Sequence, residues 1–265
     1  MESIKGLIPF VHTAGELAVE RQRSVTRSYK ADGSILTQVD GELDQFLRDS
    51  IVSLYPESNV ITEENPAPVD EGVDFTFAVD PIDGTDCYSQ GMPGWAISIG
   101  LLDRNLDPIA GILLAPKWGP EVSGGVLFFA DIGKEAVLNG EEIPQVEPEL
   151  HSPTLTQVMV GSSIHRRCDM RTFEGKVRNA GSTVAHIFAP LIHRAVVGTI
   201  LSPNYVWDIA GAHAVVKSKG LLMEYFGGKP IDYRPLAARE RAPEMIVSGT
   251  RAGIDLIRAH FRPFD

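Results

Sequence analysis

Cysteine is scarce in this chain of 265 residues, which contains only Cys87 and Cys168. The two lie far apart in sequence and form neither a CxxC motif nor a Cys/His cluster. This spacing argues against a structural zinc site and against a disulfide framework. A chain with so few thiols is typical of a reducing compartment, so we expect a cytoplasmic protein.

Positive charge is also in short supply, with 24 Lys and Arg against 35 Asp and Glu and a net charge of -11. Such an acidic protein has no diffuse positive field to hold nucleic acid or an anionic membrane. A phosphate ligand would need local help from bound cations, helix N-termini or single basic residues. Carboxylates that recruit a metal ion would supply that help.

Long apolar runs are missing as well. Charged residues interrupt residues 1–23, so we expect neither a signal-peptide core nor a membrane span there. Hydrophobic residues still make up 43% of the chain and charged residues 22%, which is ordinary for a globular protein. The length suits one large domain or two small ones.

Hydrophobic periodicity divides the chain into two parts. In the first, helical spacing predicts helices at 13–23 and 43–54, while apolar runs predict strands at 60–62, 75–79, 96–102, 109–115 and 126–130, with a hairpin turn at Asn139-Gly140. In the second, strands are expected at 155–160, 195–200, 221–226 and 245–247, and helices at 182–193, 207–219 and 252–261. The proline-rich segment 144–153 lies between them. We therefore predict a layered α/β fold in a single domain, with an N-terminal α+β half of about 1–148 and a C-terminal α/β half of about 149–265.

The strongest chemical motif is the segment Asp80-Pro81-Ile82-Asp83-Gly84-Thr85. Two carboxylates flank a bend fixed by proline, so both side chains and the Ile82 carbonyl can converge on one point. Hard oxygen ligands of this kind favour magnesium or manganese. The free N–H groups of Gly84 and Thr85 would then receive a phosphate oxygen.

In isolation, this hexapeptide is equally compatible with a surface turn that caps a helix. Its context favours the metal site, because a second strand ends upstream on Glu63-Glu64 and Trp207-Asp208 opens a helix downstream. These pieces, together with the loop 30–34 and Thr37-x-x-Asp40, resemble the inositol monophosphatase superfamily over nearly the whole chain. That superfamily includes fructose-bisphosphatases, histidinol-phosphatases and adenosine bisphosphate phosphatases.

The resemblance implies a fold of alternating helix and sheet layers with the active site between two halves. It also implies that Glu63, Asp80 and the Ile82 carbonyl bind one magnesium ion, while Asp80, Asp83 and Asp208 bind a second. A third, weakly held ion shared with Glu63 is implied too, so the number of ions stays open at two or three. Thr85 and Asp40 would orient and deprotonate the attacking water. Together with the metal ligand Glu63, they are the expected catalytic residues.

Substrate contacts are implied at four further positions. Lys30 belongs to an expected mobile lid over the site, and the backbone near Gly181-Ser182 lines the substrate, although Ser182 can equally serve as the N-cap of the next helix. Leu201 stands seven positions before Asp208, where inositol-processing relatives carry a glutamate that bonds substrate hydroxyls. An apolar residue there predicts weaker recognition of a fully hydroxylated ring. This prediction assumes an ungapped alignment over residues 202–204, and with a shifted loop Asn204 or Tyr205 could supply the missing contact instead.

Several alternatives remain open at this level. Thr62 replaces a glycine common in relatives, so either Glu63 or Glu64 can face the metal, and we prefer Glu63. Cys87 is either a packing residue or a reactive thiol. The expected activity is magnesium-dependent hydrolysis of a small phosphomonoester of the inositol phosphate or sugar phosphate kind, with histidinol phosphate and adenosine 3',5'-bisphosphate as alternative substrates. A regulatory binding protein is the non-enzymatic alternative. The resemblance also implies lithium sensitivity and a homodimer.

Overall fold

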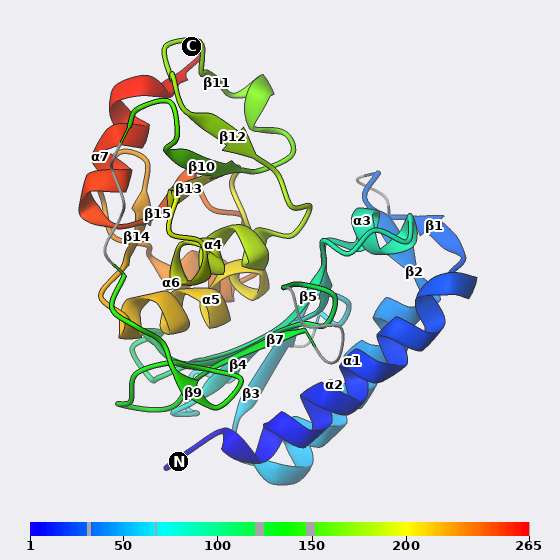
Figure 1. Ribbon diagram of the computed structural model, residues 1–265. Coiled ribbons are helices and arrows are strands. Elements are labelled where there is room, and N and C mark those ends of the chain that lie inside the picture. Colours follow the sequence, from blue (N-terminus) through cyan, green and yellow to red (C-terminus); the bar gives the residue numbers. More distant parts are fainter. Residues whose placement is uncertain (31–32, 67, 120–124, 147–151, 265) are drawn as a thin grey trace.

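Helices and sheets alternate as layers through the computed structural model of the chain, which describes residues 1–30, 33–66, 68–119, 125–146 and 152–264 (Figure 1). The helices α1 (Ile8–Arg21) and α2 (Gln38–Leu54) cover one face of a seven-stranded sheet. On its other face lie α4 (Thr183–Ile192) and α5 (Val206–Ser218), which separate it from a five-stranded sheet. The outer layer is α7 (Arg251–His260), packed on the second sheet. This arrangement confirms the predicted layered α/β fold.

The seven-stranded sheet follows chain order from its first strand to its last. Its strands are β3 (Asn59–Thr62), β4 (Thr76–Asp83), β5 (Ala96–Leu102), β6 (Pro108–Ala115), β7 (Val126–Ala130), β8 (Val137–Leu138) and β9 (Glu141–Glu142). Only β3 and β4 pair in parallel, so both end at the same edge of the sheet. The final hairpin turns at Asn139 and Gly140, whose φ angles are 50° and 84°, as the sequence predicted.

The five-stranded sheet has the order β12-β10-β13-β15-β14. Its strands are β10 (Gln157–Val160), β12 (Lys176–Arg178), β13 (Val196–Leu201), β14 (Leu222–Tyr225) and β15 (Ile246–Gly249). Two short ribbons, β1 (Arg27–Tyr29) with β2 (Ile35–Thr37) and β11 (Cys168–Asp169) with β16 (Arg262–Pro263), were not predicted. Each of these strands has only two or three residues, too few to show a hydrophobic pattern.

Local sequence determines where the first two long helices begin. Thr37 and Asp40 form a reciprocal capping box at the start of α2, which is why α2 begins five residues before the hydrophobic pattern at Leu43. α1 likewise begins earlier than predicted, because Pro9 is tolerated in the first turn of a helix. Two short helices, α3 (Thr85–Ser89) and α6 (Tyr233–Ala237), were not predicted as separate elements. Short 3-10 turns cover Lys5–Leu7, Gln22–Ser24 and Ile164–Arg166.

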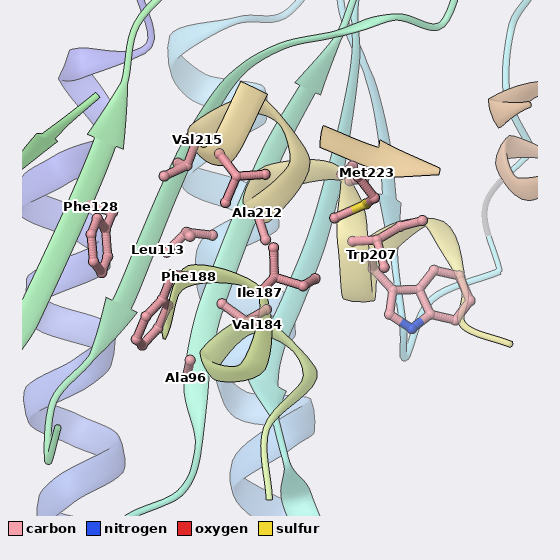
Figure 2. Close-up of a cluster of buried hydrophobic side chains, with 14 of the residues drawn as sticks. Ala96, Leu113, Phe128, Val184, Ile187, Phe188, Trp207, Ala212, Val215 and Met223 are labelled. Carbon is pink, nitrogen blue, oxygen red and sulfur yellow. The ribbon is translucent and has the colours of Figure 1, made fainter. Parts of the chain in front are cut away.

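The main core fills the space between the two sheets. Figure 2 shows Val184, Ile187 and Phe188 of α4 packed with Leu113 and Phe128 of the larger sheet, and with Ala212 and Val215 of α5. The backbone of α5 comes very close to β5 and β6. A Cβ on Gly111 would lie 2.3 Å from the Gly211 carbonyl oxygen, and one on Gly100 would lie 2.5 Å from the Gly211 nitrogen. Three glycines therefore set how closely the helix approaches the sheet.

Within the described residues, none of the helices has the length and apolar character needed to cross a membrane. The proline-rich segment expected at 144–153 is only partly described, since 147–151 lie outside the described residues. The division into halves at about 148 stays a prediction.

We predict that Gly111→Ala lowers the free energy of unfolding by about 1–3 kcal/mol, because the added methyl group overlaps the α5 backbone. Gly41→Ala is the matched control. Gly41 lies exposed in α2 with nothing within 4 Å of an added Cβ, so the same substitution should stabilise by about 0.5–1 kcal/mol. Urea denaturation of both variants checks the opposite signs. Equal effects would contradict the close approach of α5.

Candidate active site

Three carboxylates meet where β4 ends and α5 begins. Asp80 and Asp83 lie in the last four residues of β4, and Asp208 lies in the first turn of α5. Each offers an oxygen atom, and these oxygens all lie within 4.8 Å of one another. Asp80 is 1% exposed and Asp83 5% exposed. The Ile82 N–H donates to Asp80 Oδ1 at 2.9 Å, which fixes that carboxylate across the bend made by Pro81.

Burial and mutual repulsion raise the pKa of all three acids. The pKa of Asp80 lies well above its usual range because of burial and the nearby charges of Glu63, Asp83 and Asp208. Burial and the charge of Asp83 raise the pKa of Asp208 to about 8. Burial raises the pKa of Asp83 to about 6 against the opposing effect of its hydrogen bonds. Buried oxygen ligands with this excess of negative charge fit a divalent cation such as magnesium or manganese.

Asp83 is held by the start of α4. The Ser182 hydroxyl donates to Asp83 Oδ2, and the Val184 N–H donates to the same oxygen at 2.8 Å. Ser182 also accepts a bond from the Ala185 N–H at 3.0 Å, which confirms it as the N-cap of α4. The hydrogen bond from Ser182 to Asp83 was not predicted from the sequence, because the two residues are 99 positions apart. The substrate contact expected from the backbone at Gly181 and Ser182 stays a prediction.

Asp40 and Thr85 form a second polar unit. The Thr85 hydroxyl lies 2.9 Å from Asp40 Oδ1 and 3.0 Å from the Ile82 carbonyl oxygen, both of which can accept its proton. The other Asp40 oxygen accepts the Thr37 N–H at 2.9 Å. Burial raises the pKa of Asp40 in spite of these bonds. The structure thus brings Asp40 and Thr85, the two predicted catalytic partners, together at the N-terminus of α2.

Glu63 follows β3 directly, and both Glu63 and Glu64 form an ion pair with the ammonium group of Lys30. Lys30 Nζ lies 2.6 Å from Glu63 Oε1 and 2.7 Å from Glu64 Oε1. Burial alone would lower the pKa of Lys30, but the two glutamates raise it above its usual value. The charge of Glu63 is among the largest influences that raise the pKa of Asp80 and of Asp208, which favours Glu63 as the acid nearer the cluster. Of the expected lid, Ala31 and Asp32 lie outside the described residues.

Gly84 and Gly181 come together beside the acids. Both have left-handed backbones, with φ angles of 93° and 94°, so a side chain at either position would be strained. A Cβ on Gly181 would also lie 2.1 Å from Cys87 Sγ. Burial and the charge of Asp86 raise the pKa of Cys87, which disfavours the thiolate. The geometry supports Cys87 as a packing residue.

The structure contradicts the expected substrate contact of Leu201. This side chain is 1% exposed and packs in the core between the sheets, while its backbone pairs with Ile246. From this loop the Asn204 side chain reaches the acids, with Nδ2 3.3 Å from Asp208 Oδ2, and the Tyr205 N–H donates to the same oxygen at 2.7 Å. The chain leaves β13 after Leu201 and turns before α5 begins at Val206, so counting seven positions back from Asp208 does not indicate which side chain lies near the acids.

Comparisons with known proteins agree with this geometry. The model of the family described as "Inositol monophosphatase family" matches residues 3–253. The chain is 27% identical over 238 residues to a fructose-1,6-bisphosphatase/inositol-1-monophosphatase of Thermotoga maritima, covering 86% of this chain and 87% of that protein. It is also 27% identical over 218 residues to the 3'(2'),5'-bisphosphate nucleotidase CysQ of Escherichia coli, covering 78% and 82%. A crystal structure of the extragenic suppressor protein suhB from Bartonella henselae aligns with a TM-score of 0.79 at 19% identity, over 97% of each chain.

We predict that the metal-free protein loses stability as pH rises from about 4 to about 8. The folded state keeps protons on Asp83 and Asp208 up to about 6 and about 8, whereas the unfolded chain releases them near the ordinary pKa of about 4. Unfolding therefore releases protons, and higher pH favours it. Thermal unfolding in a chelator across this range checks the trend. In Asp208→Asn the slope should be shallower, and an unchanged slope would contradict the pKa assignment.

Proposed function

The chain belongs to the inositol monophosphatase family, whose members are metal-dependent phosphatases, and we propose that it hydrolyses a small phosphomonoester with magnesium as its cofactor. The convergence of Asp80, Asp83 and Asp208 carries this proposal. Two or three ions per site, with Glu63 and the Ile82 carbonyl as further ligands, follow from the resemblance and belong to the proposal. Bound magnesium would offset the charge of the acids and of the phosphate.

The Asp40–Thr85 pair supplies the base. In this arrangement the Thr85 hydroxyl donates its proton to Asp40 Oδ1, which leaves its lone pairs free to accept a proton from a water molecule. As that water forms its bond to phosphorus, its proton passes to Thr85 and the threonine proton passes to Asp40. The bond from phosphorus to the ester oxygen breaks, and the leaving oxygen takes a proton from solvent water to depart as an alcohol. The raised pKa of Asp40 makes its carboxylate a better proton acceptor at neutral pH. The amides of Gly84 and Thr85 are the proposed phosphate contacts.

The leaving group is proposed to be an inositol or a sugar. A bisphosphorylated nucleoside is the second candidate, because the similarity to the bisphosphate nucleotidase equals that to the fructose-1,6-bisphosphatase/inositol-1-monophosphatase at 27% identity. The buried Leu201 offers no polar contact to either. Asn204 is better placed, since its amide already contacts Asp208. Histidinol phosphate remains a third candidate.

Other properties implied by the resemblance are part of the same proposal. They are sensitivity to lithium, assembly as a homodimer and a cytoplasmic location. Lithium titration against magnesium and light scattering of the purified protein test the first two directly.

We predict that chelation abolishes phosphate release and that Asp80→Asn lowers kcat by at least about a hundredfold, because Asp80 is the most buried acid of the cluster. Asp86→Asn is the matched control, since Asp86 is an exposed acid only six positions away. It should keep activity within about twofold. Phosphate release should be measured over a range of magnesium concentrations. Full activity after dialysis against a chelator would refute the metal mechanism.

A substrate screen separates the candidates. The wild-type protein should be assayed with inositol, sugar, histidinol and nucleoside phosphates at saturating magnesium, and kcat/KM compared. Asn204→Ala should shift the ranking by more than Leu201→Val does, because only Asn204 reaches the acids. No hydrolysis of any compound by the folded, magnesium-saturated protein would favour the regulatory binding protein.

A further inference from the structure

Arg239 joins two parts of the chain at the edge of the candidate active site. It follows α6, yet its side chain reaches the segment that leaves β3. Arg239 Nη1 donates to the Thr62 carbonyl at 2.7 Å and to the Asn65 carbonyl at 2.9 Å. Nη2 donates to the Glu63 carbonyl at 2.9 Å, across 176 positions of sequence. One guanidinium thus holds three carbonyl groups around Glu63.

The same side chain also touches the Asp208 side of the site. The Arg239 Cζ atom lies 4.6 Å from the ring centroid of Trp207, the residue before Asp208. Trp207 is 4% exposed, so this cation–π contact is largely shielded from water and stronger than a surface one. Arg239 therefore contacts the backbone that carries Glu63 and the neighbour of Asp208 at once.

The backbone at Arg239 supports a specific role. Its φ angle is 66°, a left-handed conformation that costs a residue with a side chain roughly 1–2 kcal/mol. The Arg239 N–H donates to the Leu236 carbonyl at 2.9 Å and so ends α6 in this conformation. Glycine would adopt it without strain, so the arginine is held there by what its side chain contacts.

We propose that Arg239 is a positioning residue for the metal site, which fixes Glu63 relative to Asp208. The inference rests on the proposed function, because it takes Glu63 as a metal ligand. The last ladder bond of the strand runs from the Glu63 N–H to the Val79 carbonyl at 3.2 Å, and the chain leaves the sheet directly afterwards. Beyond that point the Arg239 fork determines where the Glu63 backbone lies. A planar fork suits three carbonyls in a way that a single ammonium does not.

The test is a calorimetric titration of magnesium into wild type, Arg239→Gln, Arg239→Lys and Arg241→Gln. Arg241 is the matched control. It is exposed and its Cζ lies 5.1 Å from the Tyr205 ring, and among the hydrogen bonds between described residues none joins it to Thr62, Glu63 or Asn65. Loss of an outer contact typically weakens metal binding 10–100-fold, so we expect Arg239→Gln to bind magnesium at least about tenfold more weakly. Arg239→Lys should also bind more weakly, and Arg241→Gln like wild type.

Two further readouts distinguish positioning from simple stabilisation. In Arg239→Gln, kcat should return to within about twofold of wild type at saturating magnesium, whereas a change in stability alone would shift the unfolding temperature in chelator and leave the magnesium affinity unchanged. In a Glu63→Gln background, Arg239→Gln should weaken magnesium binding no further, because the two changes act on one ligand.

The outcomes separate the two claims. Wild-type magnesium affinity in Arg239→Gln overturns the inference, and if that variant does not fold, wild-type affinity in Arg239→Lys overturns it equally. Failure of the wild-type protein to bind magnesium or to release phosphate would instead refute the proposed function.

Discussion

Buried negative charge is the constraint on which the rest of the site depends. Asp80, Asp83 and Asp208 lie together with Asp40 nearby, and each of the four accepts a backbone N–H from the start of a helix or from the bend after its strand. Tyr205 donates to Asp208 at 2.7 Å, Val184 to Asp83 at 2.8 Å, Thr37 to Asp40 at 2.9 Å and Ile82 to Asp80 at 2.9 Å. These bonds favour the ionised acids, but the raised pKa values show that burial outweighs them. A bound cation would supply the positive charge that the cluster lacks.

Close packing between the layers brings the N-termini of α4 and α5 to the end of β4. α5 can present Asp208 to the end of β4 only because its backbone lies against β5 and β6, where Gly100, Gly111 and Gly211 leave no room for side chains. α4 enters the same space beside Gly84, Gly94 and Gly181, where an added Cβ on Gly84 would lie 2.7 Å from the Gly94 carbonyl oxygen. Fold and chemistry therefore share the same tight contacts, and a methyl group at the sheet would move the metal ligands as well.

Local signals were enough to predict much of this arrangement. The strand that ends on Asp80 and Asp83 and the turn at Gly84 can be predicted within a few residues of sequence, whereas the Thr37-x-x-Asp40 motif came from the family resemblance. The structure places Thr85 of the first segment 2.9 Å from Asp40 of the second. Contacts between distant segments were not predictable in this way. The bond from Ser182 to Asp83 and the fork of Arg239 each depend on the packing of whole layers. The position of Leu201 was wrong for the same reason, because a loop of unknown path separates β13 from α5.

Repulsion between the buried acids also gives a role to contacts made by residues that are distant in sequence, such as Arg239 and Ser182. A cluster of repelling acids weakens the metal-free fold, so the elements that carry it need stabilising contacts with residues outside the cluster. Among the described residues, the Arg239 side chain donates to three carbonyl groups and lies over the ring of Trp207. Ser182 caps α4 while its hydroxyl donates to Asp83. Because α6 and the loop after it provide Arg239 without contributing any of the acids, changes there can tune the metal site while the ligand set stays the same.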